Sequence, residues 1–134
     1  MNLQDYNKNG IYGEIAEGFL EIKKSKFYSY IFGIKSEEEV KNILEKIKKD
    51  NKKARHVVYA YNFKDGQGCI RSKFSNDNEP QGTGVNSIIS MLEKENVENY
   101  LVVIVRYFGG TLLGAGPLLR AYLSSFKDAY NKIK

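Results

Sequence analysis

The first third of the chain alternates between apolar and polar positions in a way that predicts two strands and a helix. Residues 11–34 are rich in β-branched and aromatic side chains, with a polar break at 23–26, which is typical of two strands joined by a turn. Ser36 and Glu39 form a capping box, because each side chain can satisfy an unpaired backbone N–H where a helix begins. A helix is predicted over 37–50, and its apolar stripe is Val40, Ile43, Leu44 and Ile47.

The middle of the chain predicts a hairpin and a second helix. Residues 55–63 and 69–74 read as two strands, with the turn-forming pair Asp65-Gly66 between them. Turn-forming residues then fill a loop over 75–84. The helix that follows ends near residue 96, and its apolar stripe is Val85, Ile88, Ile89 and Leu92.

The last third predicts a buried strand and a C-terminal helix. Residues 100–108 are almost unbroken apolar, which indicates an interior strand buried on both faces, with residues 102–105 almost wholly buried. Pro117 suits the first position of the final helix. The buried stripe of that helix is predicted at Leu119, Tyr122, Phe126 and Tyr130.

The resulting order, β-β-α-β-β-α-β-α, mixes strands and helices without strict alternation. It predicts an α/β (α+β) two-layer sandwich, with a mostly antiparallel sheet and the helices on one face. At 134 residues the chain is expected to be a single domain spanning 1–134.

Composition narrows the class of protein. The single cysteine, Cys69, excludes an intramolecular disulfide and is typical of a reducing compartment. No apolar run approaches the roughly 18 residues that span a membrane, and the polar N-terminus lacks a signal segment. A cytoplasmic location and no membrane partner are therefore expected.

The net charge of +5 is concentrated in one stretch. Residues 41–55 hold seven basic and two acidic side chains, an excess equal to that of the whole chain. Such a patch is the electrostatic footprint of a nucleic-acid partner, and it is also what a solvated helix face looks like. The densest part of the patch is Lys46, Lys48, Lys49, Lys52 and Lys53.

The segment 106–122 places four glycines between a strand and a helix, with an arginine on either side. It is not a P-loop, because Ala115-Gly116 stands where Lys and Ser/Thr are required, and it lacks the third glycine of a Rossmann fingerprint. Two interpretations stay open. The backbone N–H groups at the helix start can hold a phosphate together with Arg106 and Arg120, or the glycines only shape a tight turn.

The loop SNDNEPQGTG (75–84) contains the carboxylates Asp77 and Glu79. They can bind a metal, act in acid–base chemistry, pair with Arg55 or Arg106, or lie in solvent. His56 and Cys69, the only residues of their types, are disfavoured as a catalytic pair and supply too few ligands for a structural zinc site. No metal or cofactor is expected.

Tyrosines and phenylalanines recur on the predicted strands. Tyr28, Tyr30, Tyr59 and Tyr61 each fall at alternating positions, so that each pair shares one face of its strand. Core packing is the favoured interpretation. The alternative is a set of exposed aromatic rings beside basic residues, on which nucleic-acid bases can stack.

Four segments together resemble the IMPACT family, the YigZ-type proteins of bacteria and their eukaryotic relatives. The resemblance covers residues 15–130 and is carried by KKSKF (23–27), ARHVVYAY (54–61), SNDNEPQGTG (75–84) and VVIVRYFGGTLLGAG (102–116). The family usually has glycine where Asn78 stands, and Ala-Gly-Arg/Lys-Pro where this chain has GVNS (84–87).

The resemblance implies the fold of ribosomal protein S5 domain 2 and a role near translation. Eukaryotic relatives regulate a stress kinase by binding its activator, and bacterial relatives carry a second, ferredoxin-like domain that is expected to be absent here. No enzyme activity is implied. No DNA sequence specificity is expected.

The leading functional hypothesis is a non-enzymatic, translation-associated module that contacts structured RNA, the ribosome or a translation-regulatory protein. The alternative is a small enzyme or nucleotide-binding protein that uses residues 109–116 as a phosphate cradle. The oligomeric state and the true ligand are left open by the sequence. The predicted binding site consists of Arg55, His56, Asp77, Glu79, Gly82, Thr83, Arg106, Gly109, Gly110, Gly114, Gly116 and Arg120.

Overall fold

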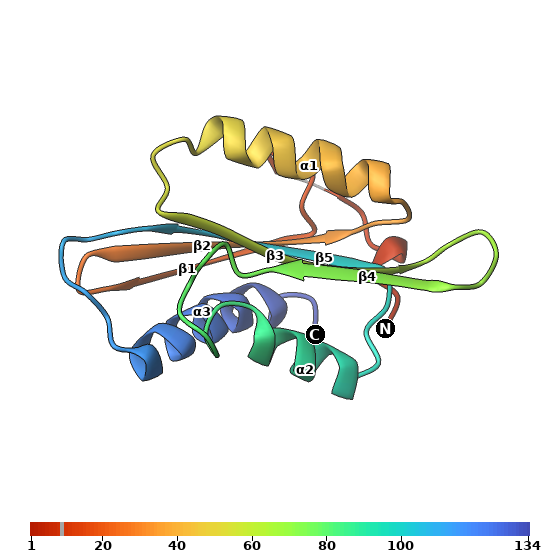
Figure 1. Cartoon of the computed structure of the whole chain (residues 1–134). Coiled ribbons are helices and arrows are strands. Elements are labelled where there is room, and N and C mark those ends of the chain that lie inside the picture. Colours follow the sequence, from red (N-terminus) through yellow and green to blue (C-terminus); the bar gives the residue numbers. More distant parts are fainter. Residues whose placement is uncertain (9) are drawn as a thin grey trace.

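The computed structural model describes residues 1–8 and 10–134 and contains every strand and helix that the sequence predicts (Figure 1). The strands are β1 (Ala16–Ile22), β2 (Ser25–Gly33), β3 (His56–Lys64), β4 (Ile70–Ser75) and β5 (Tyr100–Tyr107), and the helices are α1 (Glu37–Asp50), α2 (Asn86–Lys94) and α3 (Ala115–Tyr130). A short 3-10 helix at Leu3–Asp5 precedes them. The sheet order is β1-β2-β5-β3-β4, and all neighbouring strands are antiparallel.

The mixed α/β class with an antiparallel sheet is confirmed, but the placement of all helices on one face is wrong. Figure 1 shows α1 on one side of the sheet and α2 with α3 on the other. Accordingly the apolar residues divide into two clusters, one beneath α1 and one beneath α2 and α3.

The reason lies in the central strand β5, which is hydrogen-bonded to β2 and β3. Leu101, Val103 and Val105 belong to the α1 cluster, whereas Val102 and Ile104 belong to the cluster under α2 and α3. All five side chains are 0% exposed. A strand that is apolar on both faces must be covered on both, so the predicted interior position of 102–105 is confirmed and requires a third layer.

The helix ends follow local rules with two departures. The Ser36 hydroxyl accepts a hydrogen bond from the Glu39 N–H at 3.2 Å, but the Glu39 carboxylate pairs with Lys8 instead of returning to the cap. The last helix begins at Ala115, two residues before Pro117, which is tolerated because N–H groups of the first turn have no acceptor within the helix.

Helix α3 lies close against β1 and β2, and this contact fixes the position of Tyr122. A side chain at Gly18 would come within 2.6 Å of the Ala129 backbone nitrogen, so only glycine permits this approach. The hydroxyl of Ser29 donates to that of Ser125 at 2.9 Å across the same contact. Within the predicted stripe of α3, Leu119 is only half-buried, and its neighbour Leu118 is buried instead.

In the described part of the chain, none of the helices combines the length and the apolar character needed to cross a bilayer.

Replacing Ile104 with alanine should lower the free energy of unfolding by about 2–5 kcal/mol, because a fully buried side chain is lost from the central strand. The matched control is the same substitution at Ile70, which is 57% exposed on edge strand β4 and should change stability by less than about 0.5 kcal/mol. Urea unfolding measures both values. Equal effects at the two positions would contradict the central role of β5.

Candidate functional site

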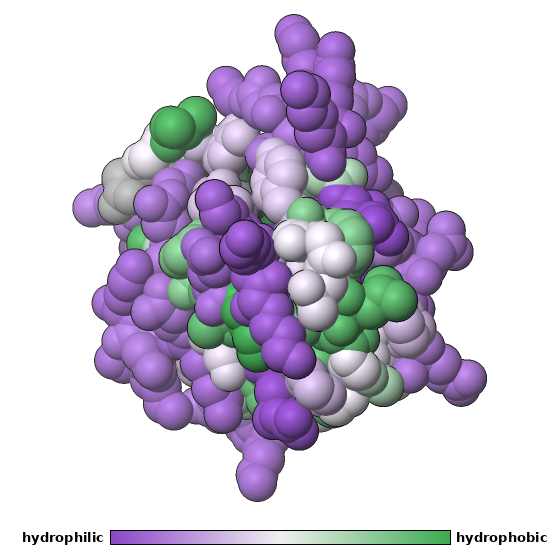
Figure 2. Space-filling view, turned by 90° about the vertical axis from the view of Figure 1, so that its left-hand side faces the viewer, coloured by the Kyte–Doolittle hydropathy of each residue, from purple (hydrophilic) through white to green (hydrophobic). Residues whose placement is uncertain are grey.

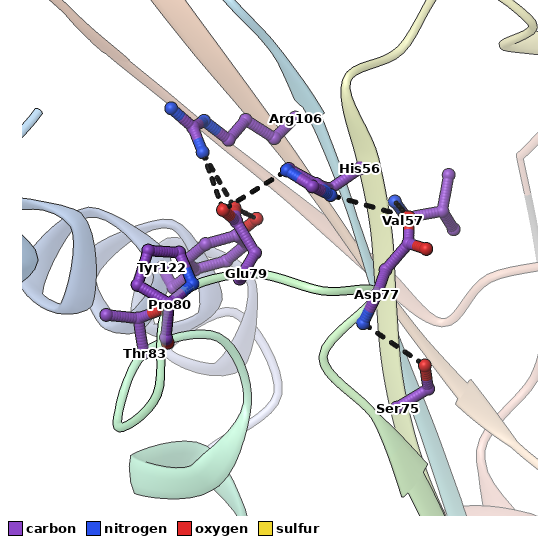
Figure 3. A network of polar contacts seen from close by, with 9 residues as sticks. All are labelled: His56, Val57, Ser75, Asp77, Glu79, Pro80, Thr83, Arg106 and Tyr122. Atoms are coloured by element: carbon purple, nitrogen blue, oxygen red, sulfur yellow. Dashed lines mark hydrogen bonds and ion pairs between the residues drawn. The ribbon is translucent and has the colours of Figure 1, made fainter. Parts of the chain in front are cut away.

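Four of the residues predicted for a common site, His56, Asp77, Glu79 and Arg106, converge at one end of the sheet, on the face covered by α3. Arg106 lies near the end of β5, and His56 opens β3 directly opposite it in the antiparallel register. Strand alternation sends both side chains to the side of Val58 and Ile104, toward α3 and the loop 76–84. Figure 3 shows how they meet Glu79 from that loop.

The Glu79 carboxylate is the centre of this polar cluster, and its side chain is 1% exposed. The Arg106 Nη1 donates to both Glu79 oxygens at 2.8 Å. The Tyr122 hydroxyl donates to Glu79 Oε2, and His56 Nε2 lies 3.3 Å from Glu79 Oε1. The carboxylate is therefore neutralised and hydrogen-bonded within the fold, as a buried charge must be.

Tyr122 enters the cluster as a neutral hydrogen-bond donor. Burial raises its pKa above 10.0, and the negative charge of Glu79 and the hydrogen bond to it raise the pKa further. The ring packs edge-on against Phe27, with 5.1 Å between the ring centroids. Phe27 also lies beneath the Arg106 guanidinium, 5.8 Å from its centroid.

The loop 76–84 turns Glu79 inward through two successive residues with left-handed backbone. Asp77 has φ +47° and Asn78 has φ +63°, a region that asparagine and aspartate tolerate better than other side chains. Asn78 stands where the motif that this loop resembles usually has glycine, and asparagine is among the side chains that tolerate this backbone conformation. The Glu79 N–H closes the turn by donating to the Asn76 carbonyl at 2.9 Å.

The side chain of Asn76 anchors the loop to the start of α2. Its Oδ1 accepts a hydrogen bond from the Val85 N–H at 2.9 Å, and its Nδ2 donates to Asn86 Oδ1 at 2.6 Å. The Thr83 hydroxyl is buried and donates to the Pro80 carbonyl at 2.6 Å. Loop 76–84 is therefore held by its own contacts, independently of any ligand.

Asp77 is the outer carboxylate of the cluster, with a side chain 46% exposed. Its Oδ2 accepts a hydrogen bond from the Val57 N–H at 2.8 Å and lies 3.7 Å from His56 Nδ1. His56 consequently lies between two carboxylates, one buried and one open to solvent.

The predicted ion pair between an arginine and a loop carboxylate is present, between Arg106 and Glu79. Arg55 does not join it. Its guanidinium lies 4.3 Å from the centroid of the Phe108 ring, while its backbone N–H donates to the Arg106 carbonyl at 2.8 Å.

Tyr122 was predicted only as core, since its spacing in α3 matches any buried stripe and carries no signal for a polar contact.

The glycine-rich loop forms an outer, exposed arc beside the buried cluster. The Gly109 N–H donates to Ser25 Oγ at 3.1 Å, and a side chain there would overlap the backbone of Lys24. Gly110 has φ +93°, which favours glycine. The rest of the predicted set is exposed on this arc or at the tip of loop 76–84, and consists of Gly82, Gly114, Gly116 and Arg120.

The Glu79 carboxylate is enclosed, and the cluster is open to solvent only at its margin, at Asp77. The buried carboxylate is already bonded to Arg106 and Tyr122, so it is not a free general base. His56 begins β3, whereas Cys69 lies beyond the opposite end of that strand, so the two side chains are far apart. Across residues 1–8 and 10–134, no group of three His, Cys, Asp or Glu side chains is arranged to hold a metal ion.

The basic patch lies on the other side of the sheet, at the C-terminal end of α1. Figure 2 looks onto this end of the molecule, with hydrophilic side chains gathered at the top, where α1 ends. Arg106 is 5% exposed and neutralised, so it does not extend this surface. All five predicted lysines are exposed, namely Lys46, Lys48, Lys49, Lys52 and Lys53.

Replacing Glu79 with glutamine should lower the free energy of unfolding by about 3–5 kcal/mol, because the buried Arg106 then lacks a counter-charge. Adding Arg106→Met should cost less than the sum of the two single changes, since the unpaired charge disappears. Urea unfolding of the two singles and the double measures the coupling. The control, Glu98→Gln at an exposed position, should shift stability by less than about 0.5 kcal/mol, and strict additivity of the pair would contradict the coupling.

Replacing Tyr122 with phenylalanine should make the free energy of unfolding fall less steeply as the pH rises above 10. The pKa of Tyr122 is raised in the fold, so above pH 10 the tyrosine ionises in the unfolded chain while it stays protonated in the native one. Unfolding then releases a proton, and the wild type should lose about 1.4 kcal/mol more per pH unit than the variant. Urea unfolding from about pH 8 to 11 measures both slopes, which should coincide below pH 10; parallel curves above it would contradict the buried role of Tyr122.

Comparison with known proteins connects this geometry to a family. The Impact N-terminal domain model matches residues 23–130, which include the whole polar cluster. The IMPACT family member YvyE of Bacillus subtilis is 35% identical over 120 residues, covering 90% of this chain and 54% of that protein. The chain spans about half the length of the curated relatives it matches.

Two solved structures share the fold. One, described as a hypothetical protein, has a TM-score of 0.77 and 31% identity, covering 87% of this chain and 57% of that one. The two-domain translational regulator Yih1 has a TM-score of 0.61 and 24% identity, covering 95% of this chain and 50% of that one. The match over residues 23–130 and the 35% identity to YvyE show that the chain belongs to the IMPACT family.

Proposed function

We propose that this chain is a non-enzymatic binding module that acts in translation regulation in the cytoplasm by contacting structured RNA. The observation that carries the proposal is the exposed run of lysines at the end of α1. Membership of the IMPACT family supports a role near translation, and the fold is shared with a protein described as a translational regulator.

The lysines of this run are free to meet phosphates. Within the described residues, none of the five takes part in an ion pair. They lie on one end of one helix and on the turn after it, so their charges add at a single surface. Exposed, uncompensated lysines release counterions from RNA when they bind, which is the main source of sequence-independent affinity.

The buried cluster supports a binding role over an enzymatic one. Arg106, Tyr122 and His56 surround the Glu79 carboxylate, and the histidine is held between two carboxylates. These contacts stabilise the loop that bears Glu79 and leave the Glu79 carboxylate unavailable to a substrate.

A phosphate-binding function of the glycine-rich loop is the second candidate, and one observation favours it. Helix α3 begins at Ala115, its N-cap residue Gly114 provides no side-chain hydrogen bond, and Arg120 lies beside Gly116 on the exposed first turns. Free N–H groups and a nearby guanidinium are the elements of an anion site. Saturable binding of ATP by the wild type that Arg120→Gln abolishes would favour this function over the RNA-binding one.

Binding to a labelled RNA hairpin should weaken as salt rises, with a log–log slope of about −0.7 to −0.9 per phosphate contacted. Three to five contacts predict an affinity loss on the order of 20- to 500-fold between about 50 and 200 mM salt. Replacing Lys48, Lys49, Lys52 and Lys53 with alanine should flatten this slope without unfolding the protein, because exposed helical positions accept alanine. Fluorescence anisotropy across a salt series measures the slope.

The matched control removes the same four charges elsewhere, at Lys35, Lys64, Lys73 and Lys94, all of which are exposed. This variant should keep most of the slope. Equal slopes in the two variants would show that the α1 lysines are only a solvated helix face and would contradict the proposal. If the protein does not bind the hairpin at about 50 mM salt, the partner is a protein instead of RNA.

A further inference from the structure

The α1 side of the sheet is only partly covered, and the uncovered part forms an aromatic hollow. Helix α1 packs over β3 and β5, through contacts such as those of Leu44 and Ile47 with the cluster around Val57 and Val103. Beyond its C-terminal end a cavity of about 470 Å³ remains over β2 and the end of β5. We name it the aromatic hollow, and its main walls are Tyr28, Tyr30, Tyr107 and Phe108, with Lys24 and Lys26 at the rim.

The rings of the hollow are held in place before any ligand arrives. Tyr28 and Tyr107 come from neighbouring interior strands and meet edge-on, with centroids 6.0 Å apart. The Tyr107 hydroxyl donates to Asn51 Oδ1 at 2.6 Å, and Asn51 also lines the cavity. On the outer side, Phe19 lies 5.0 Å from Tyr28 and is 44% exposed. Rings fixed on a sheet lose little entropy on binding, which favours stacking.

The charge around the hollow is basic where a ligand backbone would run. Lys24 and Lys26 are exposed on its rim, and Lys52 and Lys53 directly follow Asn51. Arg55 adds a guanidinium over the Phe108 ring. Acidic residues are also near: Glu17 and Glu21 lie on edge strand β1, where Glu21 is directly opposite Lys26 in the register, Glu14 lies near Tyr30, and Asp50 directly precedes Asn51.

Partly exposed aromatic rings beside exposed cations match one ligand chemistry better than others. The flat faces of nucleobases stack on tyrosine and phenylalanine, while the phosphates between them contact lysine and arginine. A base-paired duplex cannot use the hollow, because its bases already stack on one another and its A-form surface offers mainly phosphates and sugars.

We propose that the aromatic hollow binds an unpaired, single-stranded stretch of RNA, with bases stacked on Tyr28 and Phe108 and phosphates on Lys24 and Lys26. The inference rests on the proposed function, in which the partner is RNA. Asn51 lines the hollow and stands in the chain between the α1 lysines and Lys52, so a hairpin with an unpaired flank can engage both surfaces at once.

The test uses a fluorescein-labelled eight-nucleotide oligoadenylate and fluorescence anisotropy at about 50 mM salt. Tyr28→Leu and Phe108→Leu should each weaken binding by at least about fivefold, the lower end of the loss expected for one base–aromatic stack. Leucine keeps the apolar contact with the core, and thermal unfolding verifies that each variant is folded. The matched control is Phe74→Leu, a 50% exposed phenylalanine on edge strand β4, which should leave the affinity unchanged.

An abasic oligomer of the same length separates stacking from charge. It keeps the phosphates and lacks the bases, so the wild type and Tyr28→Leu should bind it equally. Lys26→Gln should weaken binding of both oligomers, whereas Lys64→Gln, an exposed lysine at the end of β3, should weaken neither.

The outcomes distinguish the hollow from the lysine patch. If the hairpin binds but Tyr28→Leu and Phe108→Leu bind oligoadenylate as the wild type does, the hollow proposal fails and the proposed function stands. If oligoadenylate binding depends on the two rings while the four-lysine variant keeps its hairpin affinity and salt slope, the hollow stands and the lysine patch fails. Binding of the oligodeoxyadenylate at least tenfold more tightly than oligoadenylate would overturn RNA as the occupant.

Discussion

The burial of β5 on both faces is the constraint from which the arrangement of this molecule follows. Residues 101–105 have no solvent-facing side chain, so the strand must be central and each face must be covered by a helix layer. The next residue along, Arg106, then carries a charge into the edge of the same buried layer. A charge at that depth costs several kcal/mol unless it is neutralised on the spot, and Glu79 neutralises it.

The pairing of Arg106 with Glu79 connects two parts of the chain that lie outside the sheet. Glu79 brings in the loop before α2, and Tyr122 brings in the middle of α3. His56, which is already paired with β5 in the sheet, approaches the same carboxylate. Because Arg106, Tyr122 and His56 share this carboxylate, the loop and the helix cannot shift independently. The cluster thus adds to the loop's own hydrogen bonds in holding a loop rich in turn formers in one conformation.

Sequence signals that act within a few residues predicted the strands and helices well. The way in which these strands and helices pack on one another was predicted less well. The bounds 37–50 of α1 follow from one capping residue and one apolar stripe, both of which act within a few residues. The Arg106–Glu79 pair could be predicted from the sequence, because an arginine that directly follows a buried strand needs a counter-charge. The side of the sheet on which α1 lies could not be predicted. An apolar stripe shows that one side of a helix is buried, but it does not show which face of the sheet that side packs against.

Two tyrosines have surroundings that the sequence left undecided, for the same physical reason. Tyr122 and Tyr28 both fit an apolar stripe, and the sequence does not distinguish a tyrosine whose hydroxyl meets a buried carboxylate from one whose ring borders a cavity. In each case the outcome depends on a neighbour from another element, Glu79 for Tyr122 and the end of α1 for Tyr28. The core interpretation of Tyr61 is correct, with 5% of the residue exposed, whereas Tyr28, Tyr30 and Tyr59 are only partly buried.

The glycine-rich loop connects the buried polar cluster on one face of the sheet with the rim of the aromatic hollow on the other. Gly109 follows β5 and packs directly on the β1–β2 turn, where its N–H donates to Ser25 and its bare Cα leaves room for the backbone of Lys24. Lys24 in turn stands on the rim of the aromatic hollow. The segment that most resembles the family motif therefore holds the buried cluster through Arg106 on one side and shapes the rim of the hollow through Gly109 on the other. Its glycines are needed for close backbone approach whether or not they ever meet a phosphate, so a glycine-rich sequence between a strand and a helix is, in this fold, first a packing requirement.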